Sequence, residues 1–168
     1  MKIIESKEQM ILEEFKGTDP DLSAHIMIIL HRGICLYGNA ISDVFPSIPK
    51  EDYISAIFED INYIRKCLTE KPVYSILNLC RVFWFITEGQ VSSKEESGEW
   101  AMEVIPQKYK ALLTDSLNMY RGVKASASFD MKLLRDFFAY ITEEINIRFR
   151  ATIHLHREGR STGGTGSE

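Results

Sequence analysis

The segment between Pro72 and Gly89 constrains the fold most, because it is apolar around nearly the whole circumference of a helix. Its apolar positions are Val73, Ile76, Leu77, Leu79, Val82, Phe83 and Phe85. Proline favours the first turn of a helix and glycine its end, so both boundaries are marked. A helix that is apolar on every side is stable only when other helices surround it. The sequence therefore predicts a helical bundle with this segment at the centre of its core.

Five other segments carry the start signals or the one-face spacing of surrounding helices. They run from Pro20 to about Leu30, across Ile54–Ile64, from Ser93 through Val104, from Pro106 to about Tyr120, and across Leu134–Ile145. Asp19 is placed to cap the first, and Ser93 with Glu96 forms the pattern of a capping box for the third. The last has its core-facing stripe at Leu134, Phe137, Phe138, Ile141 and Ile145. We expect the bundle to span residues 49–150.

One strand is predicted, at Ile34–Tyr37, where a short apolar run lies between Gly33 and Gly38. A single strand cannot satisfy its own backbone hydrogen-bonding groups. Either its partners lie outside this chain or the segment is irregular. At the other end, residues 151–168 are expected to be a disordered tail, because Glu158 and all that follows offer no apolar side chain for burial. The fold class expected is mainly α, a helical bundle with one short strand.

Composition and charge exclude several classes of protein. With 20 Lys and Arg against 24 Asp and Glu, the net charge of −4 offers no general attraction for nucleic acid. The longest apolar stretch, Val73–Ile86, is shorter than the roughly 20 residues that cross a bilayer, so no membrane span and a cytoplasmic location are predicted. Cys35, Cys67 and Cys80 lack the spacing of a metal site and are expected to be buried, reduced thiols.

Lys94 is the main candidate for a binding residue. It stands where the capping box opens a helix, so its ammonium and the free backbone N–H groups of the first turn could meet a phosphate. The alternative is an ordinary surface lysine. Tyr120 and Trp100 could stack on a base or a sugar, although aromatic residues at helical spacing more often fill cores. Arg81 on the apolar helix needs an anionic partner, and a salt bridge to a facing acid is expected.

No complete catalytic site is visible in the sequence. There is no glycine-rich phosphate loop, and no Gly-Ser turn followed by the paired acids that hold magnesium on a nucleoside triphosphate. We therefore predict no catalytic residue and no metal site in this chain. Two alternatives stay open. One is a non-catalytic helical interaction module, and the other is a HEPN-like ribonuclease, whose R-x4–6-H signature fits Arg148 and His154.

From Asp19 onwards the sequence resembles the C-terminal portion of the aminoglycoside nucleotidyltransferases, the spectinomycin and streptomycin adenylyltransferases of bacterial antibiotic resistance. Three stretches carry the resemblance. The first holds Asp19–Ser23, Ile34–Gly38 and Val44–Pro46; the second is Ile76–Val82; the third runs from Glu88 to Lys94, through Glu99–Ala101 and Pro106–Tyr109, to Tyr120. They cover most of residues 19–149 in the order and spacing of that family.

The resemblance implies a division of labour between two domains. An N-terminal nucleotidyltransferase domain, missing here, would supply the magnesium ligands and the general base for AMP transfer from ATP to an antibiotic hydroxyl. Residues 1–48 would be the end of that domain, with Ile34–Tyr37 as its last strand. Lys94 matches the family lysine that contacts the ATP phosphates, and Tyr120 a tyrosine beside the nucleotide. Arg81 and Trp100 also match positions of the family, and we expect their side chains to stabilise the fold.

Two departures from the family limit this expectation. Residues 1–15 do not match the family. The Gly-Ser motif, the paired acids and the base have no counterpart, so the isolated chain should bind neither ATP nor magnesium and should be inactive. Streptomycin-modifying members have acidic residues just before the central helix, where this chain has Glu70–Val73, so spectinomycin is the expected aminocyclitol substrate. Without its partner domain the chain is expected to leave an apolar surface uncovered and to self-associate as a homo-oligomer.

Overall fold

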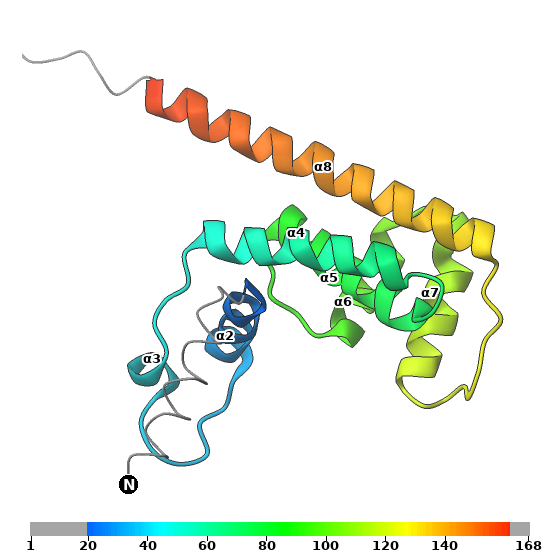
Figure 1. Cartoon of the computed structure of the whole chain (residues 1–168), viewed down its shortest axis with the longest axis horizontal. Helices are drawn as coiled ribbons and strands as arrows, with labels where there is room; N and C mark the ends of the chain where they lie inside the picture. The colour runs from blue at the N-terminus through cyan, green and yellow to red at the C-terminus, as the bar shows by residue number, and fades with distance from the viewer. Residues whose placement is uncertain (1–19, 162–168) are drawn as a thin grey trace, which may run out of the picture. The chain divides into compact units, whose positions relative to one another are not determined.

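The computed structural model describes residues 20–161, and residues 1–19 and 162–168 lie outside the described part (Figure 1). All regular structure within residues 20–161 is helical, which confirms the mainly α fold. The helices are α2 (Pro20–Arg32), α3 (Ile41–Val44), α4 (Lys50–Cys67), α5 (Pro72–Glu88), α6 (Lys94–Val104), α7 (Gln107–Tyr120) and α8 (Met131–Ser161). The described residues divide into a smaller unit, up to residue 57, and a larger one from residue 58, with the boundary inside α4. No helix in the described part is long and apolar enough to cross a membrane.

The central helix of the larger unit is α5, as the sequence predicted. It packs against α6, α7 and α8, and its side chains Ile76, Leu77, Leu79 and Cys80 are fully buried. Pro72 is its first residue, and Gly89 ends it with a left-handed backbone at φ 73°, a conformation that favours glycine. An apolar circumference is stable in this chain because three neighbouring helices cover it.

Helices α6 and α7 form an antiparallel pair joined by the short connection Ile105–Pro106. A Cβ atom at Gly98 would lie 2.7 Å from Leu117 Cδ2 and 2.9 Å from Leu77 Cδ2. Glycine at this position therefore lets α6 approach α7 and α5 at the same time. The fully buried Tyr109 of α7 contacts Phe137 of α8 edge to face, with ring centroids 5.3 Å apart.

The C-terminal helix α8 contributes a stripe of fully buried side chains, Leu134, Phe137, Ile141 and Ile145. It also runs antiparallel to the part of α4 in the same unit. Phe58 contacts Phe149 at 5.0 Å between ring centroids, and the Arg65 guanidinium lies 5.6 Å from the centre of the Phe138 ring. The same long helix thus packs against α5 and makes side-chain contacts with this part of α4.

Four sequence predictions, on the strand, Cys35, the C-terminal tail and the Asp19 cap, need correction or fall outside the described residues. Residues 34–37 are irregular rather than a strand, because no partner strand is present in the described residues. Cys35 is exposed in this loop, with its Sγ 3.1 Å from the carbonyl oxygen of Asn39, whereas Cys67 and Cys80 are buried free thiols as expected. Helix α8 continues past residue 150 to Ser161, since no glycine or proline interrupts it before Gly159. The predicted cap at Asp19 lies outside the described residues.

Candidate functional site

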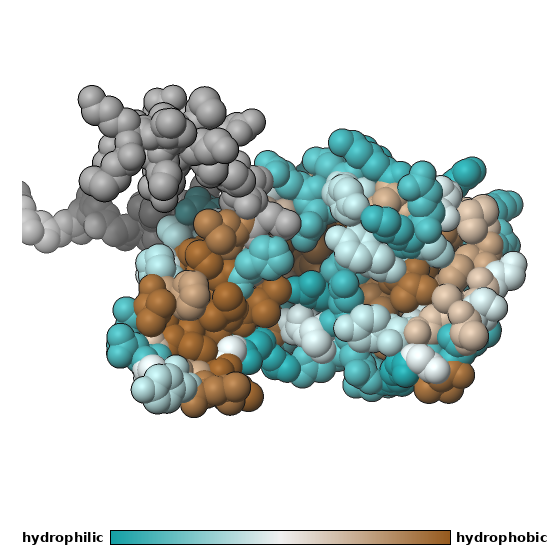
Figure 2. Space-filling model, turned by 60° about the horizontal axis from the view of Figure 1, so that its bottom comes forward, coloured by the Kyte–Doolittle hydropathy of each residue, from teal (hydrophilic) through white to brown (hydrophobic). Residues whose placement is uncertain are grey.

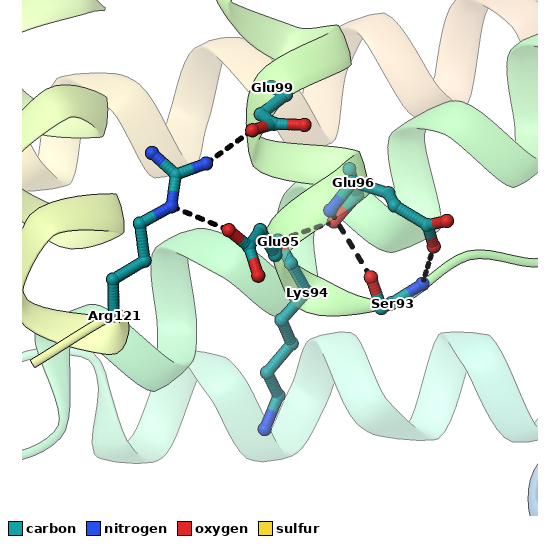
Figure 3. A network of polar contacts seen from close by, with 7 residues as sticks. Ser93, Lys94, Glu95, Glu96, Glu99 and Arg121 are labelled. Carbon is teal, nitrogen blue, oxygen red and sulfur yellow. Dashed lines mark hydrogen bonds and ion pairs between the residues drawn. The ribbon is translucent and has the colours of Figure 1, made fainter.

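The candidate site is built on the first turn of α6 (Figure 3). The N-cap residue Ser93 accepts a hydrogen bond from the Glu96 N–H through its hydroxyl at 3.2 Å. The Ser93 N–H in turn donates to Glu96 Oε2 at 2.9 Å. This reciprocal pair is the predicted capping box. It fixes Lys94 as the first helical residue, where the helix dipole and the remaining N–H groups of the turn favour an anion.

The Lys94 side chain is half-buried, with its ammonium 4.7 Å from the centre of the Tyr74 ring on α5. Burial lowers the pKa of Lys94, and the positive charge of Arg81 lowers it further, while Asp60 opposes the shift. Desolvation and a second cation both disfavour the charged form of a lysine. An anion bound beside Lys94 and Arg81 would reverse this effect.

Arg81 belongs to α5, and its side chain reaches the loop that leads into α6. Its Nε donates to the carbonyl oxygen of Ser92 at 3.1 Å, and its Nη1 donates to Asn78 Oδ1 at 3.2 Å. The predicted salt bridge to a facing acid is absent from the ion pairs of the described residues, because neutral oxygens on its own helix and on the loop accept these bonds instead. Arg81 therefore holds the loop that precedes the Ser93 cap while keeping its charge near Lys94.

Lys94 and Tyr120 lie at the same end of the α6–α7 pair. Contacts along the pair run in antiparallel order, since Arg121 meets Glu95, Gly98 faces Leu117, and the Thr114 hydroxyl reaches the Met102 sulfur at 3.9 Å. The start of α6 and the end of α7 are therefore the open end, opposite the Ile105–Pro106 connection. Tyr120 is the last residue of α7, with its side chain 49% exposed.

A cluster of ion pairs links α6 and α7 at this open end (Figure 3). Arg121, directly after Tyr120, has its Nε 2.6 Å from Glu95 Oε1, and its Nη2 pairs with Glu99 Oε1. Glu95 directly follows Lys94 in α6. We call Arg121, Glu95 and Glu99 the clasp. Spacing alone did not single out Arg121, but Glu95 and Glu99 are four residues apart on one helix face, a pattern that can hold one cation.

Trp100 lies further along α6 and contacts α5. Its ring stacks on Trp84, with centroids 5.3 Å apart and planes 6° from parallel, and it meets Phe83 edge to face at 5.2 Å. The two indole N–H groups donate to the two oxygens of Glu88, Trp84 at 2.9 Å and Trp100 at 3.0 Å. These contacts are those of a residue that joins α6 to α5, and the supporting role itself stays a prediction.

Arg148, the residue on which the ribonuclease alternative depends, is engaged in packing. It pairs with Glu144 one turn earlier on α8, and its guanidinium lies 4.8 Å from the centre of the Phe83 ring. The side chain of His154 lies outside the described part. Nothing in these contacts points to catalysis.

Sequence comparison identifies the family. The family model "Aminoglycoside adenylyltransferase, C-terminal domain" matches residues 43–144. A spectinomycin 9-adenylyltransferase from Staphylococcus aureus is 29% identical over 104 residues, covering 62% of this chain and 40% of that protein. An aminoglycoside (3'') (9) adenylyltransferase from Klebsiella pneumoniae is 23% identical over 133 residues, covering 76% of this chain and 49% of that protein. The chain thus spans about half the length of these relatives or less.

A solved structure has the same fold. The crystal structure of a spectinomycin adenyltransferase from Enterococcus faecialis, with ATP and spectinomycin, superposes with a TM-score of 0.65 at 19% identity. The match covers 82% of this chain and 57% of that one. The resemblance read from the sequence is therefore confirmed at the level of family and fold.

Proposed function

Because this chain belongs to the family of aminoglycoside adenylyltransferase C-terminal domains, we propose that it forms the nucleotide-facing wall of an adenylyltransferase. The proposed reaction moves AMP from ATP to a hydroxyl of an aminoglycoside or aminocyclitol antibiotic. Its proposed ligand residues are Lys94 for the phosphates and Tyr120 for the nucleoside. A cytoplasmic location, where ATP is available, follows from this proposal.

One observation carries the proposal. Lys94 is the first residue of a capped helix, and it lies beside Arg81 and at the same end of the α6–α7 pair as the exposed Tyr120. A triphosphate needs cations and N–H donors, whereas a nucleoside needs a flat, partly exposed partner. The cations and N–H donors at the start of α6 and the exposed ring of Tyr120 at the end of α7 are both present at this end of the bundle.

The proposed chemistry divides between this chain and a nucleotidyltransferase domain. The acceptor hydroxyl attacks the α-phosphorus of ATP, the bond from that phosphorus to the β-phosphate oxygen breaks, and pyrophosphate leaves. Lys94, with Arg81 nearby, would hold the phosphates and oppose their negative charge. Within the described residues no three His, Cys, Asp or Glu side chains converge as a metal site requires. We assign the magnesium ligands and the base to the other domain.

The smaller unit offers a surface for that other domain. Ile34, Leu36 and Tyr37 are 83%, 93% and 100% exposed, and Figure 2 shows apolar side chains gathered over this part of the molecule. We propose that residues 1–48 complete a nucleotidyltransferase domain. Spectinomycin is the proposed acceptor, in keeping with the names of the S. aureus relative and of the solved structure.

Pyrophosphate release tests this division of labour. Alone, with ATP, magnesium and spectinomycin, the purified chain is expected to release none. Fused from Asp19 onwards to the N-terminal part of the S. aureus relative, the chain is expected to give spectinomycin-dependent release and to bind ATP. The intact relative is the positive control. Magnesium-dependent release by the isolated chain would contradict the assignment of catalysis, and a folded fusion without ATP affinity would contradict the nucleotide role.

The isolated chain is expected to self-associate through the exposed segment 34–37. Monomers rarely expose contiguous apolar patches of large size, because association removes such patches from water. Light scattering of the wild-type chain should show a concentration-dependent rise in mass, which Leu36→Ser with Tyr37→Ser should reduce. Val123→Ser, another exposed apolar position at 74%, is the matched control. A clean monomer at high concentration would count against this interface.

A further inference from the structure

We propose that Arg121 is a positioning residue of the nucleotide site. Through the clasp it sets the separation between Tyr120, at the end of α7, and Lys94, at the start of α6. The inference rests on the proposed function, since it concerns the two residues assigned to ATP. Arg121 itself is not proposed to touch the nucleotide.

The place of the clasp in the fold supports this role. Helices α6 and α7 are covalently joined only through Ile105–Pro106, so the separation of their other ends depends on side-chain contacts with each other and with α5. One turn further into the pair, the Leu117 side chain of α7 lies close to Gly98 of α6. Beyond them, the polar link between the two helices is Arg121 with Glu95 and Glu99. Fraying of helix ends is resisted where such tertiary contacts are made.

Each residue of the clasp is placed to transmit this restraint. The Arg121 backbone N–H still bonds to the carbonyl oxygen of Leu117, so its position is tied to the last turn of α7. Glu95 and Glu99 lie on successive turns of α6, which fixes the guanidinium along the helix axis as well as across it. Tyr120 precedes Arg121 and Lys94 precedes Glu95. The Arg121 guanidinium therefore links the residue after Tyr120 to the residue after Lys94, the two proposed ligand residues.

A purely electrostatic effect and a positioning effect predict opposite changes in ATP affinity when Glu95 and Glu99 are both replaced by alanine. Glu95 and Glu99 are negative charges close to a proposed phosphate site, so removing them should strengthen ATP binding by reduced repulsion. If their main effect is to hold Arg121, removing them should weaken ATP binding although the site becomes more positive. The sign of this change separates positioning from charge.

The experiment uses the full chain fused to the N-terminal part of the S. aureus relative, with magnesium-ATP affinity measured by calorimetry. Arg121→Ala and Glu95→Ala/Glu99→Ala are each expected to weaken ATP binding by about three- to tenfold, an effect that two exposed ion pairs can supply. The triple variant should be no weaker than either, because both remove the same link. Arg121→Lys should recover part of the affinity. Lys124→Ala, which breaks the neighbouring half-buried pair with Asp115 at 2.7 Å, is the matched control and should bind ATP normally.

A second measurement examines the clasp without nucleotide. Amide hydrogen exchange in the isolated chain should be faster at 94–98 and 118–122 in both clasp variants, and unchanged there in Lys124→Ala. Three results would overturn the positioning role and leave the proposed function standing. The first is unchanged hydrogen exchange in the clasp variants, and the second is tighter ATP binding by Glu95→Ala/Glu99→Ala. The third is normal ATP affinity of Arg121→Ala in a fusion where Lys94→Ala weakens ATP binding. A wild-type fusion that does not bind ATP would overturn both.

Discussion

Replacing Lys94 with alanine is expected to weaken ATP binding by about ten- to a hundredfold in a protein that joins this chain to a nucleotidyltransferase domain. A charge-assisted hydrogen bond of this kind is worth about 1.5–3 kcal/mol. The loss should be partial, because the N-terminus of α6 and the nearby Arg81 keep part of the attraction for the phosphates. Tyr120→Ala should give a smaller defect through lost contact with the nucleoside.

The control for this variant is Lys108→Ala. Lys108, at the start of α7, has its ammonium 4.6 Å from the centre of the Tyr109 ring, much as Lys94 lies 4.7 Å from that of Tyr74. Both variants remove one lysine and one cation–π contact at a helix start, but the start of α7 has no side-chain cap. Calorimetry and thermal unfolding should be run side by side. Equal ATP affinity in both variants, or a Lys94 variant that simply unfolds, would make Lys94 an ordinary surface lysine.

Replacing Phe137 with alanine is expected to lower the free energy of unfolding by about 3–5 kcal/mol, the usual cost of a large buried side chain and of the cavity it leaves. Phe137 is fully buried and contacts the Tyr109 ring, so α7 and α8 lose a contact that both share. Urea denaturation followed by circular dichroism would measure the change. Because a domain of this size has only about 5–15 kcal/mol of stability, the variant should be close to unfolding at 37 °C.

Phe138 provides the comparison on the same helix. It is half-buried and lies under the Arg65 guanidinium rather than in the core, so Phe138→Ala should cost clearly less than Phe137→Ala. Equal costs for the two variants would mean that α8 is not held by the stripe Leu134, Phe137, Ile141 and Ile145.

The sequence predicted this bundle well because burial leaves a periodic trace. Pro72–Glu88 was read as the central helix from its apolar circumference, and the structure surrounds it with α6, α7 and α8. The capping box at Ser93 was visible as well, because its two partners are local in sequence. The spacing also predicts Phe138 as a fifth core position of the α8 stripe, and this prediction is wrong. Phe138 is half-buried and lies under the Arg65 guanidinium instead.

What the sequence did not indicate depends on contacts between distant segments. Arg81 was expected to need an acid, yet carbonyl and amide oxygens close to it in the fold accept its hydrogen bonds. The strand at 34–37 was predicted from composition alone, but a strand exists only with a partner, and the described residues contain none. The clasp joins Arg121 to an acid 26 residues away, which no local pattern encodes.

The tryptophan pair makes this protein its own spectroscopic reporter. The chain contains two tryptophans, and both are in the stacked pair that joins α5 to α6. All indole emission therefore comes from one place, next to the Glu88 carboxylate that both rings share. Two nearly parallel chromophores 5.3 Å apart should also couple as an exciton, with a paired band in the near-ultraviolet or far-ultraviolet dichroism that disappears when the rings separate. Any movement of α6 relative to α5 could then be followed without a label.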